Sequence, residues 1–311
     1  MRLERNHSVY ILFFIVFLVM LKQNANQVIS GKKIADLVKV QVKEDVDRLR
    51  VKLHRKPRVV SLISGDNAEA KLYLKLRNKA CDQVGIDPVQ HEFSSQISEQ
   101  NLIEEIHQLN TDELVDGILV QLPLPDHINQ QHVLSTINPS KDVEGFTAVN
   151  MGRLVNNNPF LVPCTPLAVM KILTHHQVQL KGAHVVIVNH STVVGKPLAL
   201  LCLQKNATVS VAHVFTKDLK AITQQADVLI TAAGVPGLIT KDHVKQDAVV
   251  IDVAIVSTKD GVMGDVDFEK VKNKAKLITP VPGGVGPVTI ASALENMVKA
   301  TLASVEGENT E

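Results

Sequence analysis

Residues 278–289 read Ile278-Thr279-Pro280-Val281-Pro282-Gly283-Gly284-Val285-Gly286-Pro287-Val288-Thr289, the most informative stretch of this chain. Three prolines and three glycines within ten residues disfavour both a helix and an interior strand. An apolar run with helical spacing, residues 290–298, follows at once. We therefore predict a stiff loop that ends where a helix begins, with free backbone N–H groups at that point. Loops this rich in glycine and proline are usually functional, which favours a ligand-binding loop over a simple connection.

Upstream of this loop, short apolar segments alternate with amphipathic ones. The first half of the chain predicts strands at 58–64 and 117–121 and helices at 34–49, 68–83 and 98–109. The second half, after Pro163-Cys164-Thr165-Pro166, predicts strands at 184–188, 207–212, 227–232 and 248–253 and a helix at 195–203. Strands that alternate with helices form βαβ units in a parallel sheet. We therefore expect an α/β fold whose second half is a doubly wound, nucleotide-binding domain.

The bulk composition is that of a globular protein without a strongly charged partner. The chain has 311 residues, a hydrophobic content of 45% and a net charge of +1, which gives no indication of nucleic acid binding. Three cysteines, Cys81, Cys164 and Cys202, lack metal-ligand spacing and cannot all pair. We therefore expect neither a metal site nor a disulfide scaffold.

The N-terminus differs from the rest of the chain. Residues 9–21 are thirteen consecutive apolar residues, preceded by Arg2 and Arg5 and followed by Lys22. That length is short for a membrane span and suits a signal-peptide core or an uncleaved anchor, and membrane contact is expected only if the segment is retained. An unrepresentative start codon that adds a non-functional leader explains the segment about equally well. Residues 1–27 are therefore set apart as a leader.

Candidate ligand-binding residues lie where predicted strands end. Strand 184–188 is followed by Asn189-His190-Ser191-Thr192-Val193-Val194-Gly195-Lys196-Pro197, which lacks the G-x-G-x-x-G fingerprint but keeps a glycine at a helix start. By itself this segment fits an ordinary turn better than a phosphate site. Two further strand ends would share its sheet edge, where open α/β sheets bind ligands: Ala232-Ala233-Gly234-Val235-Pro236-Gly237 and Asp252-Val253-Ala254.

The first half of the chain has a similar polar strand end. Gln121 closes an otherwise apolar strand, and an amide at that edge suggests a hydrogen-bonded ligand. Tyr73 and Arg77 are four residues apart and share one helix face. By default, Asp142 and Glu144 are interpreted as solvated turn residues.

Together these segments resemble the bifunctional methylenetetrahydrofolate dehydrogenase/methenyltetrahydrofolate cyclohydrolase family. The resemblance runs from about Val28 to about Ala300 and rests on residues 117–125 (GILVQLPLP), Lys141-Asp142-Val143, Pro163-Cys164-Thr165-Pro166, Gly264-Asp265-Val266 and 280–287 (PVPGGVGP). It implies a folate-binding α/β domain at 28–150, joined by the C-terminal helix at 289–305, a Rossmann-like NAD(P)-binding domain at 151–288 and a cleft between them. It also implies a homodimer and a mitochondrial or cytosolic location. The hydrophobic leader suggests secretory or membrane-anchored targeting as the alternative location.

The resemblance implies the substrate and the residues that act on it. Family members oxidise 5,10-methylenetetrahydrofolate with NAD(P)⁺ and hydrolyse the methenyl product to 10-formyltetrahydrofolate. By resemblance the catalytic residues are Tyr73, Arg77, Gln121 and Glu144. The folate site would include Tyr73, Gln121 and Glu144 together with Leu122, Pro123, Pro282, Gly283 and Gly284.

Two of these residues depart from the family pattern. Arg77 stands where the family has a lysine, and Glu144 stands where it has an aspartate. A guanidinium stays protonated and cannot exchange a proton near neutral pH, as a buried lysine can. We therefore hypothesise that the cyclohydrolase step is impaired more than hydride transfer. The alternative is a catalytically degenerate homologue that binds folate or nucleotide and acts by binding or as a partner subunit.

The resemblance also implies a cofactor site. Its residues are Asn189, His190, Ser191, Gly195, Lys196, Pro197, His213, Ala233, Gly234, Ala254, Ile255 and Thr289, with Gly195 and Ser191 at the pyrophosphate and Thr289 at the nicotinamide end. Asn189-His190 replaces the family's Gly-Arg, and Ala254 replaces a glycine. No cation follows His213, where many members place a residue that meets the 2′-phosphate of NADP. We therefore expect NAD or NADP, with NAD favoured.

Overall fold

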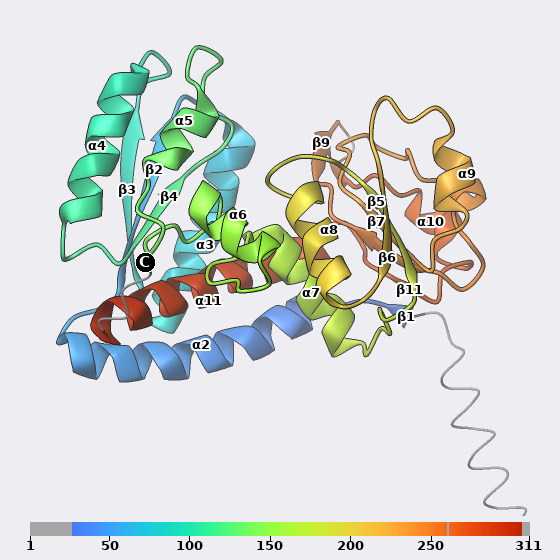
Figure 1. Ribbon diagram of the computed structural model, residues 1–311, viewed down its shortest axis with the longest axis horizontal. Coiled ribbons are helices and arrows are strands. Elements are labelled where there is room, and N and C mark those ends of the chain that lie inside the picture. The colour runs from blue at the N-terminus through green and yellow to red at the C-terminus, as the bar shows by residue number, and fades with distance from the viewer. Residues whose placement is uncertain (1–26, 260, 307–311) are drawn as a thin grey trace, which may run out of the picture.

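The computed structural model describes residues 27–259 and 261–306, which form two lobes, each built on a parallel sheet (Figure 1). The first lobe has three strands in the order β3-β2-β4: β2 (Arg58–Ser64), β3 (Asp87–Phe93) and β4 (Gly117–Val120). The second has six, in the order β1-β11-β8-β7-β5-β6: β1 (Gln27–Val28), β5 (His184–Val188), β6 (Thr208–Ala212), β7 (Val228–Thr231), β8 (Val249–Asp252) and β11 (Leu277–Ile278). The expected two-domain α/β fold is confirmed.

Helices cover both sheets. The first lobe carries α3 (Ala68–Val84), α4 (Glu99–Thr111) and α5 (Gln130–Ser135), and the second carries α8 (Gly195–Gln204), α9 (Leu219–Thr223), a 3₁₀ turn (Lys241–His243) and α10 (Phe268–Val271). Between them along the chain come α6 (Ala148–Val155) and α7 (Cys164–His175). A small antiparallel hairpin, β9 (Val256–Thr258) and β10 (Gly261–Met263), follows β8.

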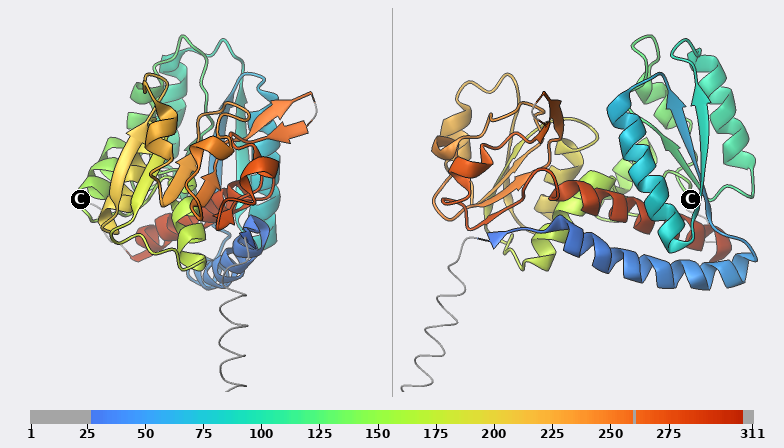
Figure 2. Two further views of the ribbon diagram at one scale, coloured as in Figure 1. Left: turned by 90° about the vertical axis from the view of Figure 1, so that its right-hand side faces the viewer. Right: turned by 180° about the vertical axis from the view of Figure 1, so that it is seen from behind.

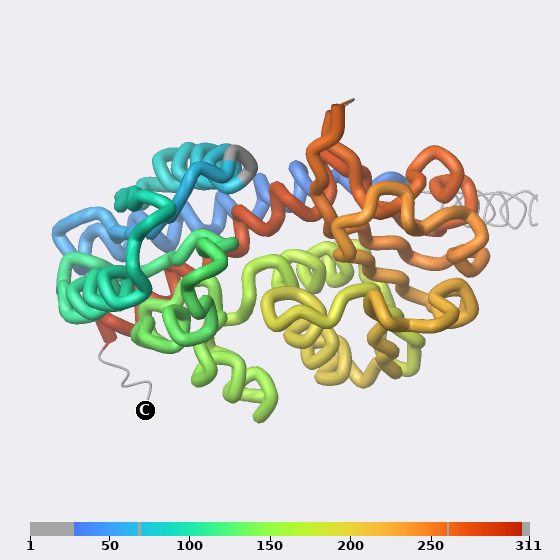
Figure 3. Tube along the Cα trace, turned by 90° about the horizontal axis from the view of Figure 1, so that it is seen from above, coloured from blue at the N-terminus to red at the C-terminus, as the bar shows by residue number. Residues whose placement is uncertain are grey.

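Two long helices, α2 (Gly31–Leu53) and α11 (Val285–Glu306), join the lobes. They pack along each other, run beneath the first lobe and reach the near side of the second (Figures 1 and 2), and from above the second lobe lies toward one end of the pair (Figure 3). Apolar residues of α2, α3 and α11 form one core with the first sheet, and α7, α8 and the start of α11 form another with the second. The C-terminal helix therefore contributes to both domains.

Local sequence explains where α3 begins and ends. The Asn67 side chain accepts a hydrogen bond from the backbone N–H of Ala70 at 2.9 Å, as a helix N-cap does. At the other end Gly85 has φ 88°, a left-handed conformation that glycine adopts without strain. The predicted helix at 68–83 is thus confirmed, with Asn67 as its N-cap.

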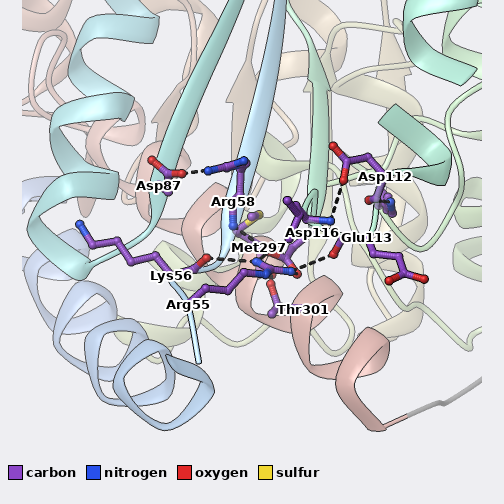
Figure 4. A network of polar contacts seen from close by, with 11 residues as sticks. Arg55, Lys56, Arg58, Asp87, Asp112, Glu113, Asp116, Met297 and Thr301 are labelled. Carbon is purple, nitrogen blue, oxygen red and sulfur yellow. Dashed lines mark hydrogen bonds and ion pairs between the residues drawn. The ribbon is translucent and has the colours of Figure 1, made fainter. Parts of the chain in front are cut away.

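A buried carboxylate fixes the lower end of the first sheet (Figure 4). The Arg55 guanidinium donates to both oxygens of Asp116, at 2.6 and 3.0 Å, and the backbone N–H of Arg58 donates to the same carboxylate at 2.7 Å. Asp116 is only 4% exposed, so removal of either donor would leave a buried charge short of a partner. This contact ties the start of β2 to β4 and leaves the carboxyl ends of the strands for other contacts.

The structure corrects three expectations. Between the predicted helices 68–83 and 98–109, where no strand was expected, the structure has β3, an edge strand whose residues are mostly half-exposed and show no clear apolar alternation. The C-terminal helix begins at Val285, not after Thr289, because Pro287 falls in the first turn, where its missing N–H costs nothing. Gln27 and Val28, which were assigned to the leader and the first domain, form β1 and pair with β11 in the second sheet.

The apolar segment 9–21 lies outside the described residues. Within 27–259 and 261–306, no helix combines the length and apolar character that crossing a bilayer requires. All three cysteines are buried and have free thiols.

Candidate active site

A buried arginine lies at the centre of the first lobe's candidate site. Arg77 of α3 is 2% exposed, and its Nη2 donates to the Ser61 hydroxyl on β2 and to the Asn78 side chain at 3.5 Å. Its Nε and Nη1 have no hydrogen-bond partner among the described residues. Since guanidinium is charged in proteins and a buried donor without a partner is costly, these two groups are suited to an acceptor on a ligand.

Gln121 presents a complementary group. Its backbone N–H continues the sheet by donating to Leu62, and its Nε2 donates to the Leu122 carbonyl, both at 2.9 Å. Its Oε1 is buried and has no partner in the described part of the chain. Ser61 pairs with Leu119 across the strands, so strand alternation puts Gln121 on the same face of the sheet as Ser61 and Arg77.

Tyr73 and Glu144 complete the cluster with Cys164. Burial raises the pKa of the Glu144 carboxyl, against the opposing effects of the Arg77 charge and the neighbouring Cys164 thiol. Burial, followed by the Glu144 charge, raises the pKa of the Tyr73 hydroxyl well above its ordinary value. The structure therefore brings Tyr73, Arg77 and Glu144 together. The lysines of the same helix, Lys71, Lys75 and Lys79, are exposed.

The default interpretation of the two acids as solvated turn residues is wrong. Asp142 is 1% exposed, and its carboxylate accepts from the Thr147 backbone N–H at 2.8 Å and from the Asn150 amide at 3.0 Å. Glu144 is half-buried. Local sequence could not show this, because the groups that cover the turn come from α6, α7 and α11.

Sequence reasoning missed one supporting residue, Asn296. It is fully buried in α11, and its Nδ2 donates to the carbonyls of Val143 and Val162 at 2.9 and 2.7 Å. The Cys164 thiol also donates to Val143, at 3.3 Å. These contacts hold the backbone beside Glu144. An asparagine in an otherwise apolar helix stretch was the available indication.

A second missed residue is Gly31, at the start of α2. Its N–H donates to the Gly283 carbonyl at 3.0 Å, and a Cβ at this position would lie 1.6 Å from the Gly284 carbonyl oxygen. The 280–284 loop is therefore seated directly on α2. Within it Pro282 and Gly283 are exposed and Gly284 is buried. Leu122 is half-buried and Pro123 is exposed.

In the second lobe, Asn189 shapes the turn after β5. Its Oδ1 accepts from the N–H groups of Ser191 and Gly195 at 2.8 and 3.0 Å, and its Nδ2 donates to the Ala232 carbonyl beyond β7 at 2.7 Å. A Cβ on Gly195 would lie 2.1 Å from the Asn189 carbonyl oxygen, so only glycine fits. The chain passes from β6 to the far side of β5 to form β7, so this turn lies at the topological switch point.

The remaining cofactor-side residues differ in exposure. His190, Lys196, Ala233, Gly234 and Ile255 are exposed, His213 and Ser191 are half-buried, and Pro197 and Ala254 are buried. A Cβ on Gly234 would meet no atom within 4 Å, so there is room for a ligand against the backbone there. Thr289 is 8% exposed, and its hydroxyl donates to the Val285 carbonyl within α11 at 3.3 Å. The Gly195 and Lys196 N–H groups are already used inside the turn.

A pair of buried aspartates supports this edge from behind. The Asp265 carboxylate accepts from the Thr231 hydroxyl and from the Ala233 and Val235 N–H groups at 2.6 to 2.8 Å. The Asp252 carboxylate accepts from the N–H groups of Ala254, Asp265 and Val266 at 2.8 to 3.2 Å. The loops beyond β7 and β8 are therefore held by charge-assisted hydrogen bonds.

Fold and site together define a class: a two-domain α/β protein that joins a Rossmann-like domain to a domain with a buried polar cluster. Residues 29–144 match "Tetrahydrofolate dehydrogenase/cyclohydrolase, catalytic domain", and residues 163–305 match "Tetrahydrofolate dehydrogenase/cyclohydrolase, NAD(P)-binding domain". The chain belongs to this family, and its cofactor is NAD or NADP.

Named relatives are similar to this protein in sequence and structure over most of the chain. The bifunctional protein FolD of Methanosarcina barkeri is 47% identical over 273 residues, which cover 88% of this chain and 95% of that protein. The FolD structure from Campylobacter jejuni, titled a bifunctional methylenetetrahydrofolate dehydrogenase/cyclohydrolase, superimposes with a TM-score of 0.87 at 43% identity, covering 89% and 99% of the two chains. The Trypanosoma brucei FolD structure, in complex with NADP cofactor and inhibitor, gives 0.86 at 35% identity, covering 90% and 98%.

These relatives confirm the resemblance seen in the sequence and place the chain in the one-carbon chemistry of folate. They support neither the hypothesis of an impaired cyclohydrolase step nor the alternative of a catalytically degenerate homologue, because proteins this similar carry the name of bifunctional enzymes.

Proposed function

We propose that this protein oxidises 5,10-methylenetetrahydrofolate with NAD⁺ or NADP⁺ and hydrolyses the methenyl product to 10-formyltetrahydrofolate. The observation that carries the proposal is the cluster of buried groups without partners in the described chain: Nε and Nη1 of Arg77 and Oε1 of Gln121. Two donors and an acceptor on one sheet face match the mixed donor and acceptor edge of a pterin ring.

Each residue then has a role that follows from its surroundings. Arg77, held by Ser61, donates to the substrate and stabilises negative charge without giving up its own proton. Gln121 accepts from a ring N–H, and Glu144, whose pKa is raised by burial, exchanges a proton closer to neutral pH than a solvated carboxyl would. Tyr73 packs on the ring with its hydroxyl kept protonated.

The nicotinamide cofactor, when bound, accepts the hydride. The chain contributes the edge of the second sheet at which the parallel strands end. The turn at Asn189, the open backbone at Gly234 and the aspartate-supported loop beyond β7 would hold the dinucleotide across the switch point. Pro282 and Gly283 would contact the folate from the side of α2.

The test is a direct assay of both reactions on the full chain, with Glu144→Gln as the informative variant. We expect wild-type turnover of both, and a loss of roughly a hundredfold in Glu144→Gln, because the positioned carboxyl is removed while the fold is kept. Glu113→Gln, the same change at an exposed position of the same lobe, should leave both rates unchanged. Absence of both activities in the wild type, with folate and dinucleotide still bound, would refute the proposal.

We further propose that the protein is a homodimer that pairs through the β6 side of the second lobe. β6 is the edge strand of its sheet and exposes Val211 by 42%, and the neighbouring helices α6 and α8 expose Val155 and Leu203 by 58% and 52%. An apolar surface beside an unpaired strand edge favours self-association. Light scattering should show a dimer that Leu203→Glu converts to monomer, whereas Leu37→Glu, at an exposed site on α2, should not.

A further inference from the structure

A single polar side chain interrupts the buried middle of the first sheet's central strand. β2 lies between β3 and β4, and its residues 59–63 are all buried. These residues read Val-Val-Ser-Leu-Ile, so Ser61, which is 0% exposed, is the polar member of an otherwise apolar run. A valine would suit a buried strand better, and a buried hydroxyl costs free energy unless it forms a hydrogen bond. Packing alone therefore does not account for Ser61.

The hydrogen-bond partner of this hydroxyl is the buried guanidinium of Arg77. Nη2 of Arg77 donates to Ser61, whereas the other acceptor of Nη2, the Asn78 side-chain oxygen, lies at 3.5 Å, the outer limit of a hydrogen bond. Ser61 is a fixed point, because β2 pairs here with Gln90 of β3 and with Leu119 of β4. The guanidinium is thus fastened to the sheet at one nitrogen, and its Nε and Nη1 have no partner among the described residues.

Arg77 lies near Glu144 without forming an ion pair with it. The Arg77 charge lowers the pKa of the Glu144 carboxyl, against the larger effect of burial, which raises it. Nevertheless, among the described residues no carboxylate oxygen lies within 4.0 Å of an Arg77 nitrogen. Opposite charges attract strongly where the surroundings screen them weakly. A guanidinium that was free to turn would therefore pair with Glu144.

We propose that Ser61 is a positioning residue, whose hydroxyl holds the Arg77 guanidinium away from Glu144 so that both groups stay available to the substrate. This inference rests on the proposed function. An ion pair between the two would occupy donors that Arg77 otherwise offers to the substrate, and it would hold Glu144 in its ionised form. Ser61 therefore acts through Arg77 and does not touch the substrate.

The other groups that act on Glu144 do not take over this part. Tyr73 of α3 and Cys164 of α7 are neutral, because burial raises the pKa of both side chains well above their ordinary values. Asp142, on the same segment as Glu144, is an acid and raises the pKa of the Glu144 carboxyl. Among these groups Arg77 carries the positive charge, so its placement determines how readily Glu144 takes up a proton.

The experiment compares kcat/KM of both reactions across pH in the wild type and in Ser61→Ala. We expect kcat/KM to fall about tenfold to a hundredfold, because a positioned group that moves by about 1 Å loses that much rate. The limb of the pH profile that reports Glu144 in the free enzyme should move to lower pH, because pairing with Arg77 stabilises the carboxylate.

Three further variants separate positioning from packing. Ser64→Ala is the matched control: strand alternation puts Ser64 on the opposite face of β2, its hydroxyl has no partner in the described chain, and the variant should behave as wild type. Ser61→Thr keeps the hydroxyl and should keep the wild-type pH limb. In an Arg77→Lys background, Ser61→Ala should change kcat/KM by less than about twofold, because no guanidinium remains to be held.

Two results would overturn the inference while leaving the proposed function intact. One is a Ser61→Ala variant that is less stable to urea but keeps the wild-type kcat/KM and pH limb, because the hydroxyl would then serve packing only. The other is an equal loss of kcat/KM in the Arg77 and Arg77→Lys backgrounds. If the wild type has neither activity, the proposed function fails. Infrared titration of the Glu144 carboxyl, assigned by its absence in Glu144→Gln, then decides: a lower pKa in Ser61→Ala supports the inference, and an equal pKa refutes it.

Discussion

At the scale of single residues, Arg77 has the most consequences for the chemistry of the candidate site. It is fully buried, held by Ser61, and keeps two donors free of partners among the described residues. A guanidinium in this place can bind and polarise, but it cannot serve as a proton carrier near neutral pH. The neighbouring Glu144, with its raised pKa, is then the remaining group that can move a proton.

Arg77→Lys should therefore increase methenyltetrahydrofolate hydrolysis, by about a hundredfold, because a buried lysine can exchange a proton with the attacking water. Hydride transfer, which depends chiefly on orientation, should change by less than about tenfold. Steady-state rates of both reactions on the same preparation measure the contrast. Lys79→Arg, an exposed position on α3, is the control. An unchanged hydrolysis rate would mean that a proton carrier at position 77 is not limiting.

At the scale of secondary-structure elements, the ends of β7 and β8 depend on the aspartate pair. Asp252 is 3% exposed, and burial raises the pKa of its carboxyl from 3.8 to about 6, despite three backbone N–H donors that act in the opposite direction. The folded protein therefore binds a proton at Asp252 more tightly than the unfolded chain does. This interaction favours the fold below about pH 4, and its contribution is lost as pH rises toward 6.

The Asp252→Asn variant should lack this pH dependence. From the shift of about two pKa units, the stability of the wild type relative to the variant should fall by roughly 3 kcal/mol between about pH 4 and pH 7. Urea unfolding of both proteins across this range measures the difference. The variant loses an acceptor at every pH, so the change with pH is the informative quantity. A difference that stays constant or grows with pH would contradict a raised pKa at Asp252.

At the scale of the whole molecule, α11 links the two lobes and supports the site. It packs against α2 and α3 of the first lobe and against α7 at the border of the second. Through Asn296 it holds the backbone at Val143 and Val162, on either side of the segment that carries Glu144. The C-terminal helix α11 thus supports a site whose other residues come from the first half of the chain.

Asn296→Ala should destabilise the protein by about 2 to 4 kcal/mol, since two buried carbonyls lose their donor. It should also lower both reaction rates by displacing Glu144. Ser292→Ala, one turn earlier on the same helix, removes a buried hydroxyl that has no partner among the described residues and should be nearly neutral. Denaturant unfolding and the two assays report the effects. Equal behaviour of the two variants would show that Asn296 does not hold the site.

The sequence by itself determined the α/β class, most strands and helices, the family and the residue types of the site, because hydrophobic periodicity, turn residues and the proline–glycine loop are local properties. Only the tertiary structure decided that Asp142 is buried, that β1 belongs to the second sheet, that Gly31 carries the 280–284 loop and that His190 lies beside His213. These features join residues far apart in the chain. Their energies depend on what covers them, and no local pattern records that.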